Sequence, residues 1–430
     1  MDKLKGLTDW VAEREIWLLA MVTPLLILSY KFPRDPTSSS RPVSLLSPGP
    51  LALLSLSIPW LCRRIAKGSF TVRTYLNLPI LGLLAMLPVS LYASAELSLS
   101  FPIVYKMITE IAVFYGIVNG LRSLKQIRGL TGLTLGGSAG ISLLTLLSTK
   151  WPASKVFSLP QIYKHMPQVI IPQLTKVGFS PNIAGGVLAM LFPLTLSFFL
   201  WGSRGILKLA LGLSLLVTAF ALFLTQSRGA WIGLAVALLT MAVLWNRWLL
   251  LGIPLSAVLA FIVIHRFGLE AVANFVLITE SAPTAASRFE IWQRAIYMLQ
   301  DFPYTGIGLG TFSRVGPLLY PYFLAGPNAY IPHAHNIFLQ AGVDLGIPGL
   351  VAFIGVLVAF VFTAWETLQL SKNSDLEPLA MGLFGGFIVY LVHGLFDSIT
   401  AVSIKAGIIV WALLGLTTAL WASLKATSQT

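Results

Sequence analysis

Long apolar segments recur along almost the whole of this 430-residue chain. Most of them are long enough to cross about 30 Å of hydrocarbon as α-helices, and helices satisfy their own backbone hydrogen bonds inside a bilayer. Charged residues make up only 10% of the chain, whereas about 25% is typical of soluble domains. The sequence therefore predicts an all-α polytopic membrane protein that forms a single transmembrane domain over residues 1–430.

We expect about twelve transmembrane helices. They cover residues 15–30, 47–62, 75–92, 101–120, 129–148, 182–201, 208–225, 230–245, 248–264, 347–368, 379–396 and 403–424.

The distribution of Lys and Arg predicts the orientation of these spans. If the N-terminus is inside, the cytoplasmic loops carry many basic residues, among them Arg63, Arg122 and Arg128, while the short outer loops at 93–100 and 397–402 carry none. Basic residues concentrate in cytoplasmic loops. Both termini are therefore expected in the cytoplasm. The net charge of +13 follows mostly from this bias and requires no nucleic-acid partner.

The longest outer segment, residues 266–335, lies between the ninth and tenth expected spans and is large enough to form a small periplasmic subdomain. Within it, Ser287 is expected to cap a helix, with Glu290 completing a capping box. Pro303 closes the pattern. One face of this expected helix is apolar and carries Phe289, Trp292, Ile296 and Leu299. This pattern is typical of an amphipathic helix that lies on the outer membrane surface.

A second local pattern begins with His335 and Asn336 and is followed, after nine residues, by Gly346 and Gly349 with a proline between them. The stretch is too long for one ordinary span, and glycine and proline break helices. We expect a short helix starting near Asn336, a break, and then the transmembrane helix proper.

Two arginines are candidate ligands for an anion. Arg228 stands between two apolar segments, where a charged side chain is costly and marks a functional site by default. The alternative interpretation is that the Arg228 side chain has no such role and only extends to the lipid headgroups. Arg288 would lie at a helix N-terminus, which disfavours a cation unless an anion binds there. A guanidinium suits diphosphate because it offers forked donors and stays charged. Arg314 shares the outer loop and is a weaker candidate.

His333 and His335 are candidates for a general base, because imidazole titrates near neutral pH. They could instead form a metal pair, but two histidines in a loop without an acidic or cysteine partner nearby are a poor metal signature. The chain has a single cysteine. We therefore expect no metal and no cofactor, and prefer His335 because it begins the spaced glycine pattern.

His393 and Asp397 stand four residues apart near the outer end of the eleventh expected span. They could form a structural hydrogen-bonded pair or a catalytic one, and the sequence does not decide. The run from Gly306 to Thr311 superficially looks like a phosphate-binding loop, but it follows no expected strand, so a dinucleotide site is not predicted.

In these residues the chain resembles the O-antigen ligase and O-antigen polymerase superfamily of bacterial membrane proteins. The resemblance covers mainly residues 180–400. It is carried by Ser180-Pro181-Asn182, Thr225-Gln226-Ser227-Arg228-Gly229, Ser287-Arg288, His335-Asn336 with Gly346 and Gly349, and His393-Gly394-Leu395-Phe396-Asp397.

The resemblance implies a glycosyltransferase of the bacterial inner membrane that takes glycan from an undecaprenyl-diphosphate-linked donor at the periplasmic face, without metal and with inversion. Arg228 and Arg288 would bind the donor diphosphate, and His335 would deprotonate the acceptor hydroxyl. Further substrate-binding residues would be Asn182, His333, Asn336 and Arg314. Supporting residues would be His393, Asp397, Gly346 and Gly349.

The acceptor could be lipid A core, a protein or a second lipid-linked repeat, so ligase and polymerase both remain open. A rival interpretation is an inorganic-carbon (bicarbonate) transport-related protein, since some similar chains carry that label. Transporters usually contain inverted repeats and helices broken near the bilayer midplane. The sequence shows no such repeat, and the candidate charges cluster at one face, which favours surface chemistry.

Overall fold

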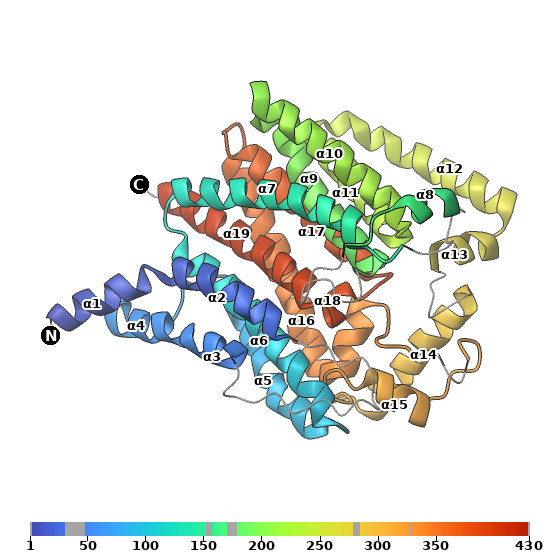
Figure 1. Ribbon diagram of the computed structural model, residues 1–430, viewed down its shortest axis with the longest axis horizontal. Coiled ribbons are helices and arrows are strands. Elements are labelled where there is room, and N and C mark those ends of the chain that lie inside the picture. The colour runs from blue at the N-terminus through green and yellow to red at the C-terminus, as the bar shows by residue number, and fades with distance from the viewer. Residues whose placement is uncertain are drawn as a thin grey trace.

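The computed structural model of the chain describes residues 2–30, 48–151, 157, 159–169, 179–277, 284–326 and 329–428. The described secondary structure is helical apart from one isolated bridge between Thr149 and Phe179. The helices form a bundle, and α14 and α15 lie at the end of the bundle where α5 ends and α6 begins (Figure 1). This confirms the predicted all-α class.

Each of the twelve expected apolar segments overlaps a helix. The helices are α2 (Glu15–Ser29), α3 (Pro48–Ser55) with α4 (Ser57–Lys67), α5 (Asn77–Ala93), α6 (Leu97–Gly120), α7 (Leu124–Ser148), α9 (Pro181–Ser197), α10 (Gly205–Thr225), α11 (Arg228–Trp245), α12 (Gly252–Phe267), α16 (Ile337–Ser371), α17 (Glu377–Gly394) and α19 (Ile404–Ser428).

Within the described residues, eight helices are long and apolar enough to span a membrane, or up to nine if α12 and α13 (Leu269–Leu277) form one span bent by 108°. The expected count of twelve is therefore not reached by this measure. The shortfall has local causes. The second expected span is divided at Leu56, and α2 and α5 have only 15 and 17 residues.

Helix α17 lies in the centre of the bundle and packs against α9, α11, α16 and α19. Its small residues allow this close approach: a side chain at Gly385 would meet Pro193 of α9 and Met241 of α11 at 2.7 and 2.6 Å. Close approach over small residues is how membrane helices gain packing energy without a hydrophobic driving force. On the perimeter, by contrast, large apolar side chains such as Leu209, Leu216 and Phe220 of α10 are exposed, as contact with lipid requires.

The expected amphipathic helix of the outer segment is present as α14 (Ala285–Asp301). The predicted cap was wrong: Thr284 is the N-cap, and it exchanges hydrogen bonds with Ser287, which occupies the third helical position. Glu290 instead accepts the backbone N–H groups of Phe323, Leu324 and Ala325. Thr284 caps because its hydroxyl meets the orphan N–H groups one turn earlier than Ser287 could.

The buried face of α14 also differs from the expected one. Ile291, Ala295 and Met298 pack into a small core with Phe312 of α15 (Phe312–Leu319). The expected apolar face is partly exposed instead, with Phe289 52% accessible and Ile296 43% accessible. Residues 278–283 and 327–328 of this outer segment lie outside the described residues.

The predicted helix break is confirmed. Asn336 caps α16, and Gly346 inside it has φ +69° and ψ −176°, so two helical pieces meet at a kink. The loop from Gly306 to Thr311 packs into this break: Ile307 donates its N–H to the carbonyl of Val343 at 2.8 Å, and Ile347 donates to the carbonyl of Pro303 at 2.6 Å. The outer segment thus satisfies backbone groups that the break would otherwise orphan.

Candidate active site

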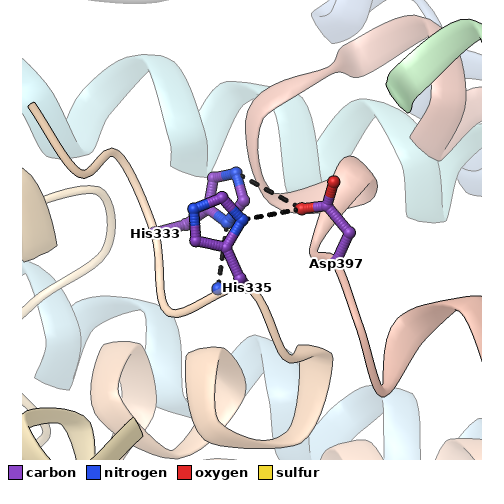
Figure 2. A group of neighbouring side chains, drawn as sticks. All are labelled: His333, His335 and Asp397. Carbon is purple, nitrogen blue, oxygen red and sulfur yellow. Dashed lines mark hydrogen bonds and ion pairs between the residues drawn. The ribbon is translucent and has the colours of Figure 1, made fainter. Parts of the chain in front are cut away.

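Asp397 and two histidines form a buried group at the C-terminal end of α17 (Figure 2). The Nδ1 atom of His335 lies 3.1 Å from Oδ1 of Asp397, and Nε2 of His333 lies 3.8 Å from the same oxygen. The two imidazole rings are 4.2 Å apart. Oδ1 of Asp397 also accepts the backbone N–H of Ser398 at 2.9 Å. Residues 62 positions apart in the chain are therefore joined by one carboxylate oxygen.

The conformation of the chain before α16 positions His335. His335 has φ +53°, a left-handed value that is uncommon for a residue with a side chain. The turn is held on both sides: Asn336 accepts the N–H groups of Phe338 and Leu339, and Gln340 accepts the N–H of Ala334 at 2.7 Å. A strained conformation held by its surroundings is typical of functional sites.

Arg288 reaches this group from α14. It is 1% exposed, and its Nη1 donates to the carbonyls of Phe396 at 2.7 Å and His335 at 3.4 Å. The side chain points into the protein and away from the N-terminus of α14, which is capped by Thr284 and Ser287. Arg288 thus contacts the carbonyl of His335 and the carbonyl of Phe396, the residue before Asp397.

Arg228 begins α11 and is half-buried on the same side of the bundle. Its Nη1 donates to the carbonyl of Asn274 at 3.4 Å, and its guanidinium lies 5.9 Å from the ring of Phe275. Its charge is close enough to lower the pKa of Arg288. The left-handed conformation of Gln226, φ +50°, makes the tight turn that brings Arg228 here. Two arginines from distant segments therefore share one neighbourhood.

The carboxylate of Asp397 is ionised. Burial alone would raise its pKa, but the hydrogen bond with His335 and the nearby histidines hold that pKa well below its usual range. Burial, with help from the charge of Arg288, lowers the pKa of His335. Burial and the neighbouring His335 lower the pKa of His333 to about 3. Burial lowers the pKa of Arg288 to about 10, so it remains charged. At neutral pH the histidines are neutral bases beside one carboxylate and one guanidinium.

The three side chains also offer ligand atoms within 4.8 Å of one another, as a metal site would. The expectation that the histidines lack an acidic partner was therefore wrong. The hydrogen bonding nevertheless opposes a metal: Nδ1 of His333 accepts the N–H of His335 at 3.1 Å, which places the ring proton on Nε2, the atom facing Asp397. A metal-bound histidine donates from its other ring nitrogen instead.

Asn182 also contacts the group, since its Nδ2 donates to Oδ2 of Asp397 at 3.2 Å; its role in substrate binding stays a prediction. His393 contacts Asp397 through the backbone, because its carbonyl accepts the N–H of Asp397 at 2.9 Å, and the two side chains are close enough to interact electrostatically. The imidazole of His393 lies between Gly186 and Gly229, where added side chains would meet it at 2.8 and 2.9 Å.

Other predicted site residues have structural contacts. Both parts of the Asn336 amide are used, the oxygen in capping α16 and Nδ2 in donating to the carbonyl of Leu395. Arg314 is not brought to the histidines but lies 3.9 Å from Glu96. Gly346 provides the kink, and Gly349 packs against Leu345. Gln340 was missed, although its spacing of four from Asn336 places both on one side of the helix.

The fold and this group define a class: an all-helical membrane protein with a buried His–Asp pair and two arginines at one end of its bundle. Residues 213–354 match the family described as O-Antigen ligase, a segment that includes Arg228, Arg288 and His335. The match confirms the resemblance that the motifs indicate.

A relative is the exopolysaccharide production protein ExoQ of Rhizobium meliloti (strain 1021). It is 29% identical over 209 residues, which cover 44% of this chain and 45% of ExoQ. The match thus spans less than half the length of either protein.

Proposed function

We propose that this protein is a membrane glycosyltransferase that moves glycan from a lipid-diphosphate-linked donor to a hydroxyl group of an acceptor, with inversion and without metal. One observation carries the proposal: a neutral histidine oriented by an ionised carboxylate lies beside Arg288, whose charge is in turn close to that of Arg228. A base and a diphosphate site must lie close together for an in-line displacement at the anomeric carbon.

His335 acts as the general base. Its Nδ1–H donates to Asp397, so Nε2 carries the lone pair that accepts the proton of the acceptor hydroxyl. The hydroxyl oxygen then forms a bond to the anomeric carbon while the bond from that carbon to the diphosphate oxygen breaks. The carboxylate of Asp397 stabilises the imidazolium that forms, as the aspartate of a catalytic triad does.

Arg228 and Arg288 receive the leaving diphosphate. Charge grows on the bridging oxygen as the bond breaks, and prearranged guanidinium groups in a site of low dielectric constant stabilise it. Arg288 is already fixed by the carbonyls of Phe396 and His335. It therefore needs little reorganisation when the donor binds. Arg228, half-buried, is the arginine that can adjust.

The match to ExoQ favours a second candidate within the same class, a polymerase that extends polysaccharide, because that relative is described by exopolysaccharide production. The chemistry is unchanged, and only the acceptor differs. Ligase and polymerase are separated by the acceptor that is used: lipid A core or protein in one case, a second lipid-linked repeat in the other.

Reconstitution tests the proposal. Purified protein in liposomes receives an undecaprenyl-diphosphate-linked oligosaccharide together with either a second lipid-linked repeat or lipid A core. We expect new glycan linkages with one acceptor and release of undecaprenyl diphosphate in equal amount, and we expect neither with His335→Ala. Folded wild-type protein that releases no diphosphate with any acceptor would contradict the proposal.

A further inference from the structure

A cavity with a mixed apolar and polar lining lies in the bundle and reaches Ser398, the residue next to Asp397. Its volume is about 110 Å³, several times the ~10–15 Å³ that one water needs. Its walls come from α5, α6, α16, α17, α18 (Ile399–Val402) and α19, together with Leu309 and Ser398 from the segments between helices. The polar residues of the lining are Lys106, Glu110, Gln340, Asp344, Tyr390, Ser398 and Thr400.

The cavity adjoins the active site on the side of the base. Ser398 follows Asp397 directly and donates its N–H to the Asp397 carboxylate. Gln340 holds the N–H of Ala334 next to His335. Neither Arg228 nor Arg288 is among the described residues that line the cavity. A ligand here would therefore lie near the His335–Asp397 pair without touching the two arginines proposed to bind diphosphate.

The charged groups in this cavity are deep inside the bundle. Lys106 and Glu110 lie roughly 14 and 20 Å along α6 from its first residue, and their side chains pair at 3.0 Å while almost fully buried. Ionisable groups inside a membrane protein are costly and mark function by default. The carboxylate of Glu110 also occupies the space that a side chain on Gly407 would need, so its position is fixed by packing.

Two polar atoms of the wall have no hydrogen-bond partner within the described chain: Oδ1 of Asp344 and Oγ of Ser398. Asp344 is 6% exposed and Ser398 is fully buried. Buried polar atoms without partners are rare, because the lost hydration is not repaid. These two atoms are therefore available to hydrogen-bond a polar molecule in the cavity.

The wall chemistry identifies the class of that molecule. Hydroxyl and ammonium donors face carboxylate and amide acceptors, and Trp411 and Tyr390 add aromatic surface. A sugar fits this mixture because each of its hydroxyls both donates and accepts. Two carboxyl groups against one ammonium oppose an anionic ligand. We propose that this cavity binds a neutral sugar residue of the acceptor, next to the hydroxyl that His335 deprotonates; the assignment as acceptor rests on the proposed function.

Binding can be measured without any transfer reaction. Ala401 lines the cavity and is partly accessible. In a Cys62→Ser background, Ala401→Cys is labelled with a small uncharged maleimide in the presence of methyl glucoside, methyl galactoside or N-acetylglucosamine. We expect at least one neutral sugar to slow labelling at least ~3-fold, and equimolar glucuronate to have no effect. Equal slowing by glycerol, or slowing by no sugar, would overturn the proposal.

Two added substitutions test the orphan atoms. Ser398→Ala and Asp344→Asn should each raise the sugar concentration needed for half-protection by roughly 2- to 10-fold, the effect of one hydrogen bond. Ser197→Ala is the matched control, because Ser197 is equally buried but bonds to Leu194 of its own helix. Unchanged protection in both cavity variants, with the proteins folded by thermal shift, would overturn the proposal.

The transfer assay distinguishes the proposed sugar site from the proposed transferase function. Ser398→Ala should raise the KM for acceptor several-fold and leave the KM for donor unchanged. If sugar protection is found but no transfer occurs with any acceptor, the sugar site stands and the transferase assignment fails. If transfer occurs while acceptor KM is unaffected by both cavity variants, the transferase stands and the sugar site fails.

Discussion

Arg288 donates a hydrogen bond of 2.7 Å to the carbonyl of Phe396, the residue that immediately precedes Asp397. This bond joins the outer segment to the end of α17, and the same guanidinium also contacts the carbonyl of His335. Arg288, which we propose binds substrate, therefore also fixes the positions of the proposed base His335 and of Asp397 relative to each other. Substitutions in this group should consequently differ in whether they affect chemistry, geometry or both.

Asp397→Asn should lower the transfer rate on the order of 10³-fold while leaving donor binding largely intact. An amide cannot stabilise the imidazolium of His335, and it favours the wrong tautomer. Single-turnover transfer and binding of labelled donor measure the two effects. Asn182→Ala, which removes the bond to Oδ2 but leaves the carboxylate in place, is the milder control. Near-normal turnover in Asp397→Asn would show that the carboxylate has only a structural role.

His335→Ala should abolish transfer, whereas His333→Ala should lower it about 10-fold. His333 does not reach the acceptor in the proposed mechanism, but it accepts the N–H of His335 and so supports its left-handed conformation. Rates at saturating substrate check this order. Chelator should change neither rate. Equal loss in the two variants together with sensitivity to chelator would indicate a metal held by His333, His335 and Asp397.

Arg228→Lys should impair transfer nearly as much as Arg228→Ala, because an ammonium cannot reproduce forked diphosphate recognition. The expected loss is on the order of 2–4 kcal/mol of transition-state stabilisation, or 10²- to 10³-fold. Arg314→Ala is a matched control from the outer segment, since Arg314 pairs with Glu96 outside the histidine group. If the lysine variant is fully active, Arg228 is a surface anchor.

The local features of this fold could be predicted from sequence because their causes are local. The break at Gly346 follows from glycine and proline, and the end of α14 at Asp301 follows from Pro303. Which hydroxyl caps α14, and which of its faces is buried, depends on what packs against it. Arg288 could therefore be identified as a candidate, but its burial could not.

The pairing of His335 with Asp397 depends on how α16 and α17 meet, and periodicity carries no information on that. The i, i+4 spacing of His393 and Asp397 does bring these two residues together, through a backbone bond of 2.9 Å and an electrostatic interaction of their side chains, but it does not reveal the hydrogen bond of Asp397 with His335. The buried Lys106–Glu110 pair is an i, i+4 pair of charged residues within an expected span. These two intramembrane charges are the sequence signal that indicates the cavity.

The pH dependence should be displaced toward acid. His335 must be neutral to act as a base, and its pKa is lowered, so kcat/KM should stay level below pH 6.5 before falling. The free energy of unfolding should also decrease as the pH falls. His333 has a pKa of about 3 in the folded protein and near 6.5 when unfolded, so the unfolded state binds more protons, and stability is lost progressively as pH falls from about 6.5 to 3. Thermal melts across this range should show the loss reduced in His333→Gln. A melting curve in that variant that matches wild type at every pH would contradict the assignment.

The orientation of the bundle follows from loop charge and can be tested at exposed positions. Cysteines introduced near the candidate residues at Ser287 or Ala334, or at Ser371 at the other end of α16, could not show which side of the membrane they face, because all three positions are fully buried. Gln293 on α14 and Ser374 between α16 and α17 are both exposed. In a Cys62→Ser background, Gln293→Cys should react with an impermeant maleimide in intact cells, whereas Ser374→Cys should react only after the membrane is opened, because the span of α16 separates them. Reaction of Ser374→Cys alone in intact cells would invert the topology and place the histidine group on the cytoplasmic face.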